Sequence, residues 1–175
     1  VMQDDDFMLA DSAAICAYLE RKQPEPSIYP RGDREYAKAL WFEQYAGGTV
    51  FQDVVHPLFH QTFVNPNVRK IETDRAAVTE VLTRAMPEIY GYLDSVAGGT
   101  FLAGSQLSVA DIAVMSNLVT VQYLGFDLDR TRYPSLAGLF DRVVRVPEVT
   151  DALRAEQPVV QQMGLKAEFL NAVLN

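Results

Sequence analysis

A helix begins within the stretch Gly104-Ser105-Gln106-Leu107-Ser108-Val109-Ala110-Asp111-Ile112. The Ser108 hydroxyl is predicted to accept from the Asp111 amide, and the Asp111 carboxylate from the Ser108 amide. This reciprocal pair is a capping box, with Asp in place of the usual Glu. Leu107 and Ile112 stand at the flanking positions of a hydrophobic staple. Box and staple together account for Ser108 and Asp111, so we interpret both as structural caps and not as catalytic residues.

The segment that follows is almost wholly apolar up to Gly125. A helix without a polar face is typically buried, so this segment is predicted to be the central helix of its domain. Its first amides would then have no water to bond. Loss of either cap partner should therefore cost roughly 0.5–2 kcal/mol, and more if the amides end up unsatisfied.

Helical spacing extends to both sides of this central segment. Gly47-Gly48 and Pro57 should make the first long helix irregular, and Pro87 should kink the second. No β-alternation of any length occurs after residue 10, so the fold class is predicted to be mainly α. The expected helices start at Asp33, at Thr73 or Asp74, at Ser108, near Pro134 and, for a short fifth helix, at Pro147, and the tail from Lys166 to Leu170 is a candidate for one last helix.

The first 32 residues have a different pattern. Residues 1–9 are interpreted as a strand end and turn, and Asp11 or Ser12 is predicted to cap a helix that runs to about Arg21. Three prolines and a glycine follow in residues 23–32, and they cannot continue a helix. We therefore predict an N-terminal piece at 1–22, a linker at 23–32 and an all-helical domain at 33–175.

Composition excludes several partners. The net charge of −8, without a basic stripe, argues against binding to nucleic acid. No apolar run is long enough to cross a membrane, and no signal peptide is visible in the residues from Val1 onward. The chain opens at Val1 rather than at Met, which leaves open whether an earlier segment precedes it. The single cysteine fits a reducing compartment, so a cytoplasmic location is predicted.

Two motifs carry a resemblance to a known family. The stretch from Thr100 to Ala113 resembles the signature at the start of the central C-terminal helix of glutathione transferases. Asp11-Ser12-Ala13-Ala14-Ile15-Cys16-Ala17-Tyr18-Leu19 is similar to the signature that ends the thioredoxin-like domain of that family. The resemblance implies a C-terminal helical bundle, preceded by the last strand and helix of a thioredoxin-like α/β domain.

The resemblance implies that glutathione is a co-substrate and that no metal takes part. It also implies that Asp11 and Ser12 hold the γ-glutamyl end of glutathione. The chemistry fits, because Ser12 offers a hydroxyl and an amide at a helix N-terminus to a carboxylate. Asp11 offers a carboxylate to the γ-glutamyl ammonium. The alternative is that these two residues only cap the helix.

No catalytic residue is expected in this chain. In the family, a Tyr, Ser or Cys near the start of the thioredoxin-like domain activates the thiol, and both it and a cis-proline precede the position of Asp11. Cys16 is interpreted as a small buried hydrophobe. His56 and His60 have the spacing of a metal pair, but Pro57 intervenes and a third ligand is not evident, so packing or surface roles are favoured.

The family also implies a second substrate and a partner. A hydrophobic electrophile would lie between the first long helix and the central helix, against Phe42, Tyr45, Thr49 and Tyr123. A homodimer is expected. The leading function is conjugation of glutathione thiolate to that electrophile. The alternatives are a non-catalytic binding module, or a glutathione-dependent reductase, peroxidase or dehalogenase on the same fold.

Overall fold

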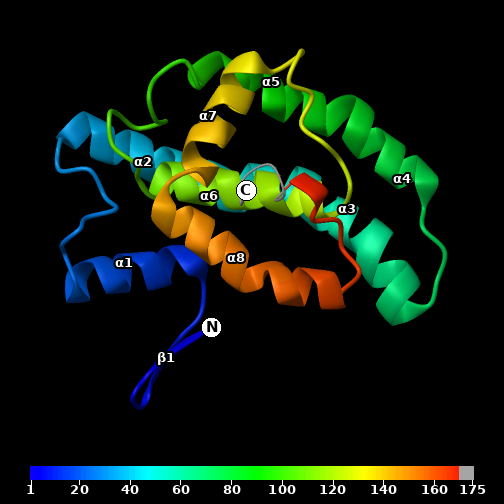
Figure 1. The fold of residues 1–175 in the computed structure, drawn as a ribbon, viewed down its shortest axis with the longest axis horizontal. Helices are drawn as coiled ribbons and strands as arrows, with labels where there is room; N and C mark the ends of the chain where they lie inside the picture. Colours follow the sequence, from blue (N-terminus) through cyan, green and yellow to red (C-terminus); the bar gives the residue numbers. More distant parts are fainter. Residues whose placement is uncertain (170–175) are drawn as a thin grey trace.

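The structure is a computed structural model that describes residues 1–169. The predicted helical domain, 33–175, thus has its last six residues outside the described part. Two short strands and one helix precede a bundle of helices, which confirms the mainly α fold class (Figure 1).

The N-terminal piece is a hairpin followed by a helix. Strand β1 (Met2–Asp4) pairs antiparallel with β2 (Phe7–Leu9), where the sequence indicated one strand end and a turn. Helix α1 (Ser12–Lys22) follows. The Asp4 carboxylate accepts hydrogen bonds from the Tyr18 hydroxyl at 2.5 Å and from the Lys22 ammonium, and these bonds tie the hairpin to α1.

Residues 23–32 contain no helix or strand. The carbonyl of Ile28 accepts a hydrogen bond from the amide of Val109 at 2.9 Å. This bond fixes the segment to the start of the central helix. The segment therefore sets where α1 lies against the bundle.

The first long helix continues much further than the sequence indicated. It comprises α2 (Asp33–Tyr45), the π-helix η1 (Ala46–Val55), α3 (His56–Phe59) and the π-helix η2 (His60–Arg69). Pro57 does not end it. The amide just before this proline, that of His56, bonds to the carbonyl of Phe51 five residues back, and such a widened turn accommodates the donor that proline lacks.

The second long helix also passes through a proline by means of a π-helical turn. It comprises α4 (Arg75–Glu80), the π-helix η3 (Val81–Ala85) and α5 (Met86–Val96). The amide of Met86, just before Pro87, bonds to the carbonyl of Val81 five residues back. The helix therefore passes through Pro87 with a local widening.

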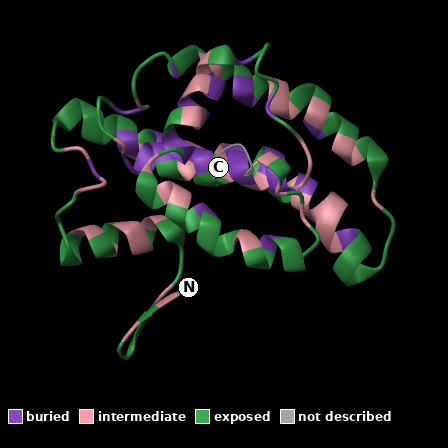
Figure 2. Cartoon of the chain, viewed as in Figure 1, coloured by how far each residue is buried: buried purple, intermediate pink, exposed green. Residues whose placement is uncertain are grey.

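Helix α6 (Val109–Tyr123) is the centre of the bundle, as predicted (Figure 2). Its buried side chains, among them Val114, Leu118 and Val121, face the core that α2, η1 and the later helices share. Helix α7 (Pro134–Val144) and helix α8 (Pro147–Gln162) complete the bundle.

Helix α8 corrects the prediction of a short fifth helix, because it has 16 residues and contains Pro158. The candidate tail helix from Lys166 to Leu170 extends outside the described residues. Leu153 and Val160 are buried, and this packing holds the helix on the bundle despite the internal proline. Within residues 1–169, no helix has both the length and the apolar character that a membrane span requires.

Candidate functional site

The N-terminus of α1 has a strained cap. Asp11 adopts φ 76° and ψ 128°, a backbone conformation that residues other than glycine rarely take. Its carboxylate accepts from the Ala14 amide at 3.1 Å, and its carbonyl accepts from the Ile15 amide at 3.0 Å. Strain of this kind costs of order 1–3 kcal/mol and concentrates at functional sites.

Ser12 stands next to this cap with its donors open. The residue is exposed, and its hydroxyl makes no hydrogen bond to any other residue in the described chain. The amides of Ser12 and Ala13 lie in the first helical turn, where no intrahelical carbonyl is available to them. The positive end of the helix dipole adds to these donors. An anionic group can therefore be held here.

Glu43 is a residue of this site that the sequence analysis missed. It lies on α2, is only 8% exposed, and accepts a hydrogen bond from the Tyr29 hydroxyl at 2.9 Å. Burial raises the pKa of the Glu43 carboxyl; the Tyr29 bond opposes that shift, and the nearby Asp11 charge adds to it. Two carboxyl groups thus share the neighbourhood of the first turn of α1. An isolated acidic residue among Trp41, Phe42 and Tyr45 was the only signal in the sequence.

Cys16 faces the same neighbourhood and is half-buried. Burial raises the pKa of its thiol, and the Glu43 charge adds to that shift. The thiol is therefore protonated near neutral pH and a poor nucleophile.

The N-terminus of α6 contrasts with that of α1 because it is buried and its two cap side chains are bonded within the protein. The Asp111 carboxylate accepts from the amides of Leu102 and Ser108 at 2.8 and 3.0 Å, and from the Ser108 hydroxyl at 3.0 Å. The two residues form a capping box. The Asp111 amide also donates to the Ser108 carbonyl at 3.1 Å. The Ser108 hydroxyl and both oxygens of the Asp111 carboxylate thus have their partners within the protein.

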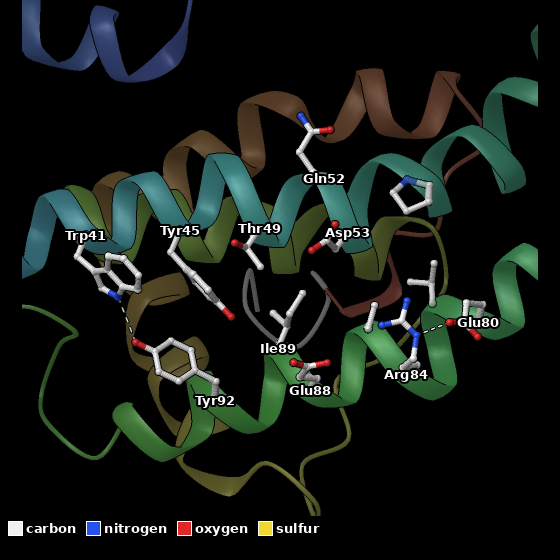
Figure 3. Close-up of a pocket in the computed structure, with 13 residues that line it drawn as sticks. Trp41, Tyr45, Thr49, Gln52, Asp53, Glu80, Arg84, Glu88, Ile89 and Tyr92 are labelled. Carbon is white, nitrogen blue, oxygen red and sulfur yellow. Dashed lines mark hydrogen bonds and ion pairs between the residues drawn. The ribbon is translucent and has the colours of Figure 1, made fainter.

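A cavity of about 780 Å³ forms a groove between α2–η1 on one side and α4–α5 on the other (Figure 3). Trp41, Tyr45 and Tyr92 line one end of it. The Trp41 ring stacks on that of Tyr45 with centroids 6.0 Å apart, and its N–H donates to the Tyr92 hydroxyl at 3.1 Å. Asp53 and Glu88 supply carboxylates further along. We call this cavity the α2–α5 groove.

The four residues predicted to wall the electrophile pocket do not share one cavity. Tyr45 and Thr49 line the α2–α5 groove. Phe42 is buried in the core. Tyr123 is buried at the far end of α6, where its hydroxyl donates to Glu156 at 2.6 Å and its ring packs on Phe169 with centroids 5.3 Å apart.

We call the neighbourhood of the first turn of α1, with Asp11, Ser12 and Glu43, the α1 site. The groove and the α1 site lie on opposite sides of α2. Residues two apart on an α-helix point about 200° apart, so Glu43 and Tyr45 face opposite directions. Glu43 faces Tyr29, Cys16 and Asp11, whereas Tyr45 faces Tyr92. Figure 3 agrees, because α1 lies across α2 from the groove.

His56 and His60 lie outside both places. The continuous helix brings their rings together, with centroids 4.4 Å apart and the ring planes tilted by 46°. Burial lowers the pKa of His60, and His56 and Arg69 lower it further. Within residues 1–169, no group of three or more His, Cys, Asp or Glu side chains is placed to hold a metal ion.

Comparison with known proteins identifies the family. A family model described as "Glutathione S-transferase, C-terminal domain" matches residues 52–156, more than half of the chain. Glutathione S-transferase D7 of Drosophila melanogaster is 30% identical over 133 residues, which are 73% of this chain and 54% of that protein. Maleylacetoacetate isomerase of Dictyostelium discoideum is 25% identical over 159 residues, 90% of this chain and 69% of that protein. The chain thus spans about half of the first relative's length.

Solved structures share the fold. A glutathione S-transferase from Rhodospirillum rubrum has a TM-score of 0.74 at 22% identity, over 83% of this chain and 66% of that one. A glutathione transferase homologue from Drosophila mojavensis, solved with bound glutathione, has a TM-score of 0.72 at 24% identity, over 92% of this chain and 68% of that one. At these identities the likeness concerns the fold alone. With the family match over 52–156, it follows that the chain belongs to the glutathione S-transferase family.

Proposed function

We propose that this chain is part of a glutathione transferase that holds the γ-glutamyl head of glutathione at Asp11 and Ser12 and conjugates its thiolate to a hydrophobic electrophile. The observation that carries the proposal is the strained, exposed start of α1, where Asp11 has φ 76° and the Ser12 hydroxyl is free within the described residues. A cap with no other role would not require this strain.

The charges of the site match a zwitterion. The γ-glutamyl head carries an ammonium and a carboxylate on one carbon atom. Asp11, with Glu43 behind it, favours the ammonium, because a cation relieves the repulsion between the two acids. The Ser12 hydroxyl and the first-turn amides favour the carboxylate. A protein homologue solved with bound glutathione adds family-level support for this co-substrate.

No residue of this site is proposed to activate the thiol. The Cys16 thiol is protonated, and the Tyr29 hydroxyl is committed to Glu43, with its pKa raised by burial and by that bond. The part of the reaction assigned to this chain is therefore to bind and orient glutathione, which gives the reaction the advantage of proximity. A cytoplasmic location is proposed with it, because glutathione keeps thiols reduced there.

For Tyr45 and Thr49 we propose a role in dimer formation, in place of the electrophile pocket that the sequence indicated. The electrophile must lie about 3–3.5 Å from the attacking sulfur. The α2–α5 groove faces away from Asp11 across a helix about 10 Å wide. We therefore propose that the groove binds the partner subunit of a homodimer. Its aromatic end supports this, because Trp41 is 55% exposed and aromatic side chains are enriched at interfaces.

The glutathione proposal is tested with the full-length protein by calorimetry. Glutathione and γ-glutamylcysteine should bind with similar affinity, whereas cysteinylglycine, which lacks the γ-glutamyl head, should bind at least tenfold more weakly. Turnover of a chromogenic aryl halide with glutathione should be measurable. Binding without turnover would indicate the non-catalytic alternative or a different glutathione-dependent reaction. Absence of both would overturn the proposal.

A second candidate reaction is glutathione-dependent isomerisation. Two similar proteins are named as isomerases, the maleylacetoacetate isomerase of Dictyostelium discoideum and a maleylpyruvate isomerase of Pseudomonas aeruginosa with a TM-score of 0.63. In this case a maleyl substrate should isomerise without net consumption of glutathione. The aryl halide assay and this assay, run side by side, separate the two reactions.

The dimer is tested through Trp41, the single tryptophan of the chain. Its fluorescence should shift to shorter wavelength as protein concentration rises, because a partner would remove its ring from water. Light scattering should show the dimer at the same concentrations, and Tyr92→Ala should weaken it. A concentration-independent spectrum from a monomer would contradict the dimer and leave the glutathione site unaffected.

A further inference from the structure

The histidine pair on the first long helix is outside the α1 site and the α2–α5 groove. In the sequence, two observations spoke against a metal role: Pro57 lies between the histidines, and a third ligand is not evident. The structure removes the first, because the helix continues from η1 through α3 into η2. His56 and His60 therefore lie one turn apart on the same face, with ring centroids 4.4 Å apart and planes at 46°.

Both imidazole rings have nitrogen atoms available to bind a metal ion. Neither ring makes a hydrogen bond to another residue within positions 1–169, and His56 is exposed while His60 is half-buried. The Phe51 ring lies beside His56, with centroids 5.9 Å apart, and limits the positions that the His56 ring can adopt. A side chain restrained in this way loses less freedom on binding a ligand.

The spacing of the rings fits a shared metal ion. With metal–nitrogen bonds of about 2.1 Å, two imidazoles on one metal have centroids about 4.5 Å apart at a 90° angle and about 5.2 Å apart at a tetrahedral angle. The observed 4.4 Å is close to the first value. Right angles between nitrogen ligands are typical of copper(II) and nickel(II), whereas zinc prefers the tetrahedral angle.

We propose that His56 and His60 form a two-histidine chelating site for divalent copper or nickel on the surface of the bundle. The structure offers no group of three such ligands within residues 1–169, so the other coordination positions belong to water or to a donor from a bound molecule. The site is independent of glutathione, because it stands on the helix well beyond Glu43 and uses no residue of the α1 site.

The test is calorimetric titration of the full chain with Ni²⁺, which does not oxidise the Cys16 thiol. A chelate needs both ligands, so His56→Ala and His60→Ala should each weaken binding at least tenfold, and each to the level of the double variant. Far-ultraviolet circular dichroism checks that the helix persists in each variant. Ni²⁺ should also bind more tightly than Zn²⁺.

Two results would overturn the proposal. One is unchanged Ni²⁺ binding in the double variant, which would place the metal on other residues. The other is a loss in each single variant of only half the effect of the double variant, which would mean two separate single-histidine contacts. Cys16→Ser is the matched control, because it removes the single thiol of the chain and should leave Ni²⁺ binding unchanged.

Discussion

Two helices of this protein start with the same chemistry and use it differently. At α6, Ser108 and Asp111 are 1% and 0% exposed, and every oxygen of the Asp111 carboxylate is bonded within the protein. At α1, Asp11 and Ser12 are exposed, the backbone is strained, and the Ser12 donors are open. Serine and aspartate are preferred at both places because they satisfy first-turn amides.

If Asp11 and Ser12 bind glutathione as we propose, burial, and not residue type, separates a structural cap from a binding cap. A buried cap must satisfy all its groups within the protein, because unpaired buried groups are costly. An exposed cap can leave donors to water and exchange that water for a ligand. Four substitutions test this distinction.

The largest effect is expected for Asp111→Ala. The change leaves the amides of Leu102 and Ser108 without an acceptor in a dry environment. We expect a loss of roughly 3 kcal/mol in the free energy of unfolding, measured by urea denaturation with an unchanged slope. Ser105→Ala, on the exposed loop just before the box, is the control and should change little. A loss below about 1 kcal/mol would remove the distinction between the two caps.

The next effect is expected for Asp11→Asn, measured as glutathione affinity. Asparagine caps a helix as well as aspartate does and tolerates a positive φ, so the fold should be unaffected. The charge that would hold the γ-glutamyl ammonium is lost, however. We expect glutathione to bind about tenfold more weakly, which is about 1.4 kcal/mol. Equal affinities for the two proteins would assign Asp11 to capping alone.

A smaller effect is expected for Asp11→Gly on stability. Glycine adopts φ 76° without strain and replaces an N-cap aspartate at a cost of only a few tenths of a kcal/mol. The relief of strain should offset that cost, so the free energy of unfolding should stay the same or rise while glutathione affinity falls. A clear loss of stability would show that the backbone at Asp11 is not strained.

The smallest effect is expected for Glu43→Gln, measured as the pH dependence of the free energy of unfolding. Its carboxyl pKa is raised in the folded protein, so the folded state binds its proton more tightly than the unfolded state. Stability contributed by this group is therefore present at low pH and declines as pH rises from the ordinary value of about 4.5 through the raised pKa. Glu43→Gln keeps an acceptor for Tyr29 and should remove this decline. Parallel pH curves for the two proteins would contradict the raised pKa.

The sequence indicated much of the bundle because its signals are local. The apolar run after Ser108 identified the central helix, and the Asp11–Ser12 pair fixed the start of α1. The continuity of the two long helices could not be predicted from such local signals. Pro57 and Pro87 are local stop signals, and they are accommodated by widened turns that tertiary packing stabilises.

Spatial groupings were harder to predict. Tyr45 and Phe42 are three residues apart, yet one lines the groove and the other lies in the core. Glu43 gave no motif, because its role depends on Tyr29 and Asp11, which approach it through the path of residues 23–32. Such relations depend on how elements pack, and a single sequence does not record that packing.

A crystal structure of the full-length protein with glutathione would test the binding role of the exposed cap most directly. We expect the γ-glutamyl carboxylate within hydrogen-bond distance of the Ser12 hydroxyl and amide, and the ammonium beside the Asp11 carboxylate. Glutathione bound elsewhere, with Asp11 and Ser12 packed against protein and no room for the ligand, would contradict the account and leave α1 with a cap and no binding site.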